Sequence, residues 1–109
     1  MNALTPGHLH ELPPDHPARL LMIAHRRLSS RPTASNGTKS IVVAAYGDYV
    51  VRLLAFVPGT ITDAVSPLWV EFHDACSDRT LDGAGCRDLS EAIAAAEEFL
   101  AEAKLLNTR

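Results

Sequence analysis

Residues 41–57 read IVVAAYGDYVVRLLAFV, two apolar runs joined by Gly47-Asp48. A Gly-Asp pair between such runs predicts a hairpin, because both residues tolerate the positive φ of a tight two-residue turn. A hairpin with one face in water alternates apolar and polar residues, but outside this turn Arg52 is the only charge. We therefore expect both faces of the hairpin to be covered, by helices or by a second copy of the chain.

Strict alternation outward from the turn divides the hairpin into two apolar faces. One face would carry Val42, Ala44, Tyr46, Tyr49, Val51, Leu53 and Val57, and the other Ile41, Val43, Ala45, Val50, Leu54 and Phe56. The residues that we expect at an interface with another chain are Tyr46, Tyr49, Val51, Leu53 and Trp69.

The flanking segments predict a single α+β domain over residues 15–109, preceded by an irregular segment over 1–14. Hydrophobic periodicity predicts a helix at 17–29, strands at 40–46, 49–57, 67–74 and 79–86, and a C-terminal helix at 89–106. Residues 29–40 are small, polar or turn-forming, and predict a flexible linker. Asp15 is the expected N-cap of the first helix, and Asp88 with Glu91 resembles a capping box before the second. The expected architecture is an antiparallel sheet of three or four strands packed by the C-terminal helix and by the N-terminal one.

Composition narrows the class of protein. The chain has 109 residues, of which 47% are hydrophobic and 21% charged, as in an ordinary globular domain. No apolar run reaches the roughly 18 residues of a membrane span, and the N-terminus lacks the pattern of a secretory signal. We expect a cytoplasmic protein without membrane contact, with its two cysteines reduced and with no cofactor.

The charge is unevenly distributed. Residues 1–39 carry five bases against two acids, or +3, whereas residues 40–109 carry five bases against eleven acids, or −6. The basic residues that could contact nucleic acid are Arg19, Arg26, Arg27 and Arg31. The element order resembles that of double-stranded-RNA-binding domains, which depend on lysines at the start of their C-terminal helix. Asp88 and Glu91 stand there instead, so nucleic-acid binding is only an alternative prediction.

A second alternative is a hydrolase-like or metal-dependent enzyme. A turn at 75–78 would set His73 opposite Asp82, with Glu71 on the same face, and a carboxylate beside an imidazole can make it a general base. Cys86 could join this group, and His73, Cys76 and Cys86 are weak candidates for a metal site. Zinc needs four ligands and paired short spacings, so a polar surface pair and two unligated thiols are the simpler interpretation.

The glycines at 83 and 85 weaken the last predicted strand. Glycine within a strand often marks a bulge or the close approach of another group. We keep both explanations open for this strand.

Two resemblances concern the C-terminal half. Residues 67–74 (PLWVEFHD), 85–89 (GCRDL) and 91–97 (EAIAAAE) resemble a group of small uncharacterised bacterial proteins, over about residues 49–106. The β-β-β-α order with Ser90-Glu91-Ala92 on the helix resembles, more distantly, the antitoxin domains of Hic-type toxin–antitoxin pairs. Those domains bind a small toxin and usually carry a DNA-binding segment, and no such pattern follows Leu106 here. The resemblance therefore implies binding of a protein partner rather than DNA.

The leading functional prediction is a non-enzymatic protein–protein interaction or regulatory module. We expect it to form a homodimer through an apolar face of its sheet.

Overall fold

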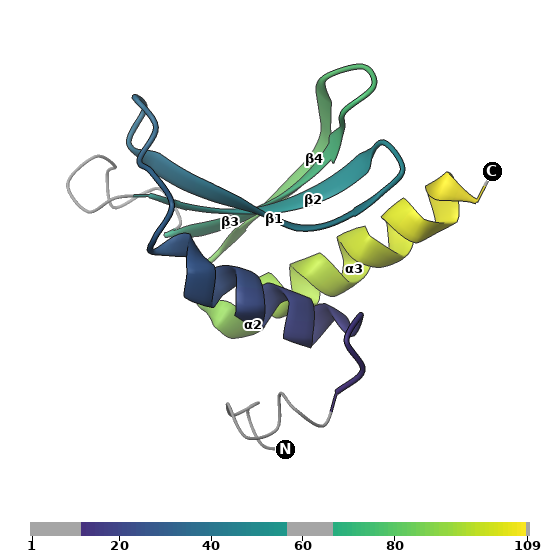
Figure 1. Ribbon diagram of the computed structural model, residues 1–109, viewed down its shortest axis with the longest axis horizontal. Helices are drawn as coiled ribbons and strands as arrows, with labels where there is room; N and C mark the ends of the chain where they lie inside the picture. Colours follow the sequence, from purple (N-terminus) through teal and green to yellow (C-terminus); the bar gives the residue numbers. More distant parts are fainter. Residues whose placement is uncertain (1–11, 57–66, 109) are drawn as a thin grey trace.

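The computed structural model describes residues 12–56 and 67–108 of the chain. Its elements are α2 (Pro17–Leu28), β1 (Thr38–Tyr46), β2 (Tyr49–Phe56), β3 (Leu68–Asp74), β4 (Arg79–Cys86) and α3 (Leu89–Asn107). The strands form one antiparallel sheet in the order β1-β2-β3-β4 (Figure 1), which confirms the predicted α+β class. In the described part of the chain, neither helix is long and apolar enough to span a membrane.

Both helices lie on the same side of the sheet (Figure 1). α2 packs against β1, β2 and α3, and α3 crosses all four strands. Of the two alternatives for the second face of the hairpin, a helix or a second copy of the chain, coverage by the N-terminal helix is therefore wrong. We call the side under the helices the covered face and the opposite side the open face.

The hydrophobic core lies between the covered face and the two helices. Val51, Leu53 and Val70 from the sheet are fully buried against Leu21 of α2 and Leu100 of α3. Each side chain of this size contributes about 1.5–3 kcal/mol when it is fully removed from water. Packing against the helices accounts for the apolar residues on the covered face of the hairpin. It does not account for the apolar residues on the open face.

A β-bulge in β1 changes the faces that strict alternation predicts. Val42 pairs with Arg52 and Ala44 pairs with Val51, so Val43 is an extra residue without a partner of its own in β2. Beyond the bulge the side chains switch faces. Ile41 therefore shares the covered face with its partner Leu53, and Val42 shares the open face with Arg52, the reverse of the prediction.

The predicted helix starts are confirmed for one helix and corrected for the other. Asp88 caps α3, its Oδ1 accepting a hydrogen bond from the backbone N–H of Glu91 at 3.0 Å. At α2 the N-cap is His16, not Asp15, and its Nδ1 accepts from the backbone N–H of Ala18 at 3.1 Å. A neutral imidazole nitrogen can thus satisfy the same orphan donor as a carboxylate.

The segment between α2 and β1 is shorter than the predicted linker over 29–40. Thr38–Ser40 already belong to β1. Two side chains join the ends of the segment: Lys39 Nζ donates to the carbonyl of Ser29 at 2.8 Å, and Arg31 Nε donates to that of Ser40 at 3.2 Å. At the other end of the hairpin, Val57 lies outside the described residues.

Candidate functional site

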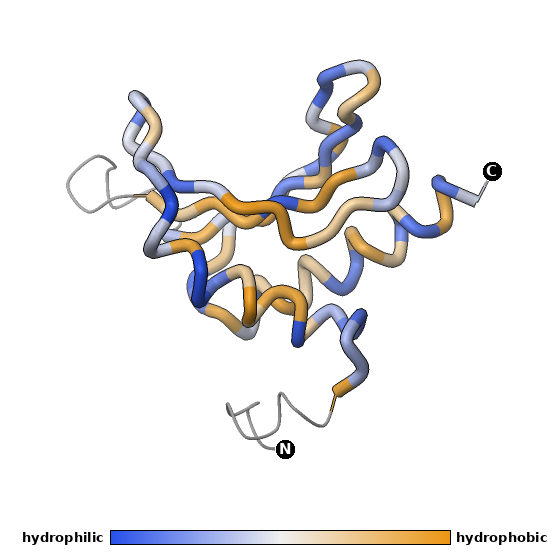
Figure 2. Tube along the Cα trace, in the orientation of Figure 1, coloured by the Kyte–Doolittle hydropathy of each residue, from blue (hydrophilic) through white to orange (hydrophobic). Residues whose placement is uncertain are grey.

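The open face is the surface that the fold leaves available for binding. Three rows of residues, each crossing the sheet from β1 to β4, form its centre: Ala45, Val50, His73 and Thr80; Val42, Arg52, Glu71 and Gly83; Ser40, Leu54, Trp69 and Gly85. The middle of the hairpin is coloured as hydrophobic in Figure 2, and its turn as hydrophilic. Most of the apolar side chains in these rows are partly or fully exposed. No helix of the described residues packs on this side.

Trp69 and the glycines of β4 form one end of the open face. Trp69 pairs with Gly85, and a Cβ on Gly83 would lie 2.7 Å from the indole Nε1. The indole therefore occupies space that only glycine leaves free. Of the two explanations considered for these glycines, close approach of another group accounts for Gly83.

An ion pair occupies the middle row. Arg52 Nη2 and Glu71 Oε1 are 2.6 Å apart, and the two side chains are only 35% and 17% exposed. The buried Nε of Arg52 has no hydrogen-bond partner within the part of the chain that the structure describes. Burying a charged donor without a full set of partners is costly. The unpaired Nε is therefore an uncompensated cost of this ion pair within the described residues.

His73 does not form the predicted group with Asp82. A second bulge, at Leu81, pairs Phe72 with Asp82 and His73 with Thr80. Asp82 therefore lies on the covered side of the sheet, and His73 lies on the open face. The prediction was wrong for two reasons. The turn pairs Asp74 with Arg79, so His73 faces Thr80, and the extra residue at Leu81 then moves Asp82 to the other face of the sheet.

His73 instead contacts the end of its own hairpin. Its Nε2 is 3.1 Å from Asp78 Oδ1, and its Nδ1 is 3.4 Å from Thr80 Oγ1. Glu71 shares the open face with His73 but is paired with Arg52. These contacts orient the imidazole between the Asp78 carboxylate and the Thr80 hydroxyl.

The two cysteines lie in different environments. Cys76 is exposed in the β3–β4 turn, whereas Cys86 is buried and pairs with Leu68, one residue from the predicted partner Trp69. Burial raises the pKa of the Cys86 thiol, and the negative charges of Glu91 and Asp88 raise it further.

The proposed metal ligands are not assembled. Over residues 12–56 and 67–108, no three His, Cys, Asp or Glu side chains form a cluster that could hold a metal ion. His73, Cys76 and Cys86 are thus not a metal site in this arrangement.

Most of the predicted interface residues lie on the covered face. Val51 and Leu53 are 0% exposed beneath the helices, so they are not accessible to a partner. Tyr46 lies under Lys104, whose Nζ is 5.4 Å from the ring centroid, and Tyr49 packs against Phe72. Of the five candidates, only Trp69 lies on the open face.

The residues that sequence analysis missed are Val42, Val50 and Leu54. Arg52 is a signal that could have found Val50 and Leu54, because alternation along the strand puts them on the same face as this charge and a charge is least costly on the wetter face. Val42 could not have been found in this way, because only the bulge at Val43 brings it to that face.

The basic residues proposed for nucleic-acid binding do not form a single patch of free charges. Arg19 Nη1 donates to the carbonyl of Leu12 at 2.9 Å, and Arg31 is bonded to Ser40. Arg26 and Arg27 are exposed near the end of α2. Two exposed guanidinium groups provide a weak electrostatic attraction to phosphates.

Both edges of the sheet carry a bulge, at Val43 in β1 and at Leu81 in β4. Bulges at sheet edges interfere with pairing to another strand, and native proteins use them to prevent edge-to-edge association. The open face, rather than either edge, is therefore the better candidate for a contact with another chain.

No family model, no curated protein and no solved structure matches this chain. The resemblances to small bacterial proteins and to Hic-type antitoxins stay predictions from the sequence.

Proposed function

We propose that this protein is a non-enzymatic interaction module, and that the open face of its sheet packs against the open face of a second copy. The observation that carries the proposal is the position of both helices on one side of a hairpin that is apolar on two sides. Apolar sheet faces are normally packed against another layer. A second copy would supply that layer, giving two face-to-face sheets of the kind found in sandwiches.

The charged residues of the open face are complementary to the same residues on a second copy. Arg52 and Glu71 are cross-strand partners on β2 and β3. A two-fold axis that runs along the strands, between these two and midway between the copies, places each Arg52 over the partner's Glu71. The partner's carboxylate would then lie beside the accessible part of the guanidinium, whose side chain is 35% exposed. A self-complementary surface is the requirement for a two-fold dimer.

The size of the face suits a modest affinity. Four strands of about eight residues, at about 4.8 Å between strands and 3.3 Å per residue, give a face of roughly 500 Å². Two copies would bury roughly 1,000 Å², which is near the lower limit for a specific interface. We therefore expect a dimer that dissociates within the micromolar concentration range.

Sedimentation equilibrium across the micromolar range tests the proposal. Leu54→Asp puts a carboxylate in the centre of the open face, and Leu105→Asp makes the same change on the exposed surface of α3. Burying the unpaired carboxylate at position 54 should raise the dimer dissociation constant about tenfold or more, while the position 105 variant should behave as wild type.

A second matched pair guards against a folding defect. Ala45→Arg places a long side chain at an exposed position of the open face, and Ala101→Arg does the same at an exposed position of α3. Circular dichroism confirms that each variant folds. Of these two arginine variants, the proposal predicts that only Ala45→Arg fails to dimerise. A wild-type protein that stays monomeric throughout the range, or dimers that all four variants leave intact, would overturn it.

A further inference from the structure

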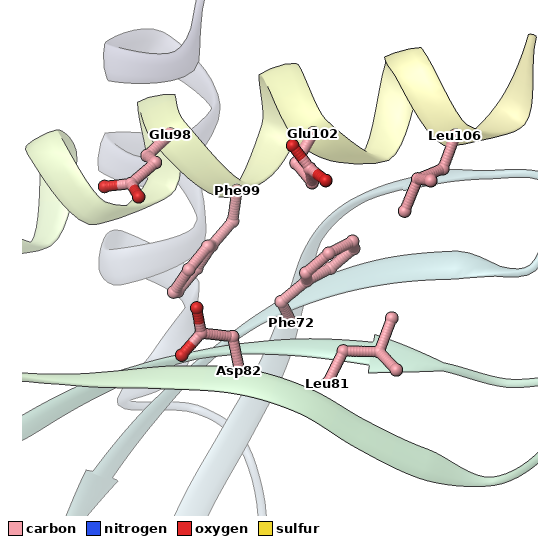
Figure 3. A pocket seen from close by; sticks show the side chains of 7 residues that line it. All are labelled: Phe72, Leu81, Asp82, Glu98, Phe99, Glu102 and Leu106. Atoms are coloured by element: carbon pink, nitrogen blue, oxygen red, sulfur yellow. The ribbon is translucent and has the colours of Figure 1, made fainter.

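A groove of about 360 Å³ lies between α3 and strands β3 and β4, on the covered side of the sheet (Figure 3). Its apolar lining comes from Phe72, Leu81, Phe99 and Leu106. The rings of Phe72 and Phe99 stack with their centroids 5.9 Å apart and form the base of the groove. The volume lies in the range of small ligand pockets, about 300–1,000 Å³, and would hold one or two side chains.

Three carboxylates border this apolar base. Asp82 comes from β4, and Glu98 and Glu102 come from α3 (Figure 3). Among the described residues that line the groove there is no Lys, Arg or His. Two glutamates elsewhere in the molecule are paired with arginines instead, Glu71 with Arg52 and Glu91 with Arg87. The groove therefore has a local excess of negative charge.

The negative charges of these three acids are poorly compensated by other groups of the described chain. Asp82 accepts a hydrogen bond only from the backbone N–H of Gly83, at 2.8 Å, and no ion pair to it, to Glu98 or to Glu102 is found in residues 12–56 and 67–108. Glu98 and Glu102 are four residues apart on one helix, where like charges repel each other. A cation placed between them would relieve this repulsion.

Exposed apolar side chains extend the groove outward. Three large hydrophobic residues of the described chain are exposed, and two of them are Leu81, at 46%, and Leu105, at 53%. Leu81 lines the groove directly. Leu105 follows Glu102 by three residues and Glu98 by seven, so it lies on the same stripe of α3. The surface thus alternates apolar and acidic groups.

We propose that this groove binds a segment of a partner protein that carries a Lys or Arg next to a bulky apolar side chain. The apolar side chain would cover Phe72, Phe99 and Leu81, and the cation would lie between the carboxylates of Glu98 and Glu102. This site is independent of the proposed function, since the helices and the open face lie on opposite sides of the sheet.

Fluorescence anisotropy with a synthetic amphipathic peptide tests the proposal. The probe is a labelled helix of about 12 residues, or three turns, made of Leu and Lys, and its control has Glu in place of every Lys. The Lys peptide should bind and the Glu peptide should not. Failure of the Lys peptide to bind wild-type protein would overturn the proposal.

Variants locate the binding. Glu102→Gln removes a groove carboxylate and should weaken binding about threefold, the effect of one partly exposed ion pair. Glu97→Gln removes the same charge from an exposed position of α3 that does not line the groove, and should change affinity by less. Equal losses in the two variants would mean that the peptide recognises only the acidic helix and would contradict the site.

The peptide titration is then repeated on the Leu54→Asp variant, whose open face is altered. The proposal predicts unchanged affinity there, so that failure of the dimer and failure of the groove can be told apart. A dimer that dissociates on Glu102→Gln would instead identify a second copy as the occupant and overturn the proposal of a partner protein.

Discussion

The indole of Trp69 lies against Gly83, so that a Cβ at position 83 would come within 2.7–3.1 Å of three indole atoms. Glycine weakens a strand, but here it gives the single tryptophan of the chain a place on the open face. Aromatic side chains commonly cover cross-strand glycines in this way. The relation links the unusual sequence of β4 to the surface that we propose for self-association.

Gly83→Ala should displace the indole. The added methyl overlaps a rigid ring, and overpacking of this kind costs about 1–3 kcal/mol in the free energy of unfolding. Chemical denaturation measures the cost, and Trp69 fluorescence reports the movement. Gly85→Ala is the matched control, because Gly85 is exposed and does not have a positive φ. Equal stability of the two variants would contradict the packing of Trp69 on Gly83.

Glu91 should make the stability of the fold depend on pH. The Arg87 side chain donates to its carboxylate, with help from the Arg87 backbone N–H, and together they lower the Glu91 pKa from its ordinary value of 4.5. A carboxylate with a lowered pKa stabilises the folded state above about pH 4.5, and that contribution is lost as the pH falls through the folded-state pKa.

The variant Glu91→Gln tests this dependence, because glutamine keeps the shape without the charge. We expect wild type to be more stable than the variant at pH 7, with the difference shrinking at acidic pH in denaturation experiments. In an Arg87→Ala background, the pH-dependent part of the difference should be smaller. A difference that is the same at pH 7 and in acid would show that the pair does not act through the carboxylate charge.

The two thiols should react at different rates. Burial and the neighbouring acids raise the Cys86 pKa and reduce its thiolate fraction, whereas Cys76 is exposed. In native protein, iodoacetamide should alkylate Cys86 about tenfold or more slowly than Cys76, as measured by mass spectrometry of the peptides. In Cys76→Ser the fast reaction should disappear. Rapid labelling of Cys86 in the folded variant would refute its burial.

The secondary structure could be predicted from the sequence because its signals are local. Gly47-Asp48 predicts the hairpin turn, and Asp88 predicts the start of α3, where its side chain accepts from the Glu91 N–H. Each of these depends on residues within one turn of chain. The α+β class followed from the order of such elements.

The site could not be predicted in the same way, because it depends on two tertiary features. The bulges at Val43 and Leu81 follow no local pattern, and each moves the residues beyond it to the other face. One bulge separated Asp82 from His73. Long-range packing places α2 beside α3 rather than on the other side of the sheet. This position of α2 determines which apolar residues are exposed.

The measurement that tests the central claim most directly is a charge swap across the proposed dimer. Arg52→Glu gives an open face with two carboxylates, and Glu71→Arg gives one with two guanidinium groups. Each variant alone should sediment as a monomer, because like charges meet across the two-fold axis. An equimolar mixture should form a heterodimer, since every carboxylate then faces a guanidinium.

Circular dichroism of each variant establishes that it is folded before mixing. Heterodimers in the mixture, with monomers in the separate samples, are the result predicted by face-to-face self-association. Folded variants that remain monomeric when mixed, or that each form homodimers as readily as wild type, would contradict it.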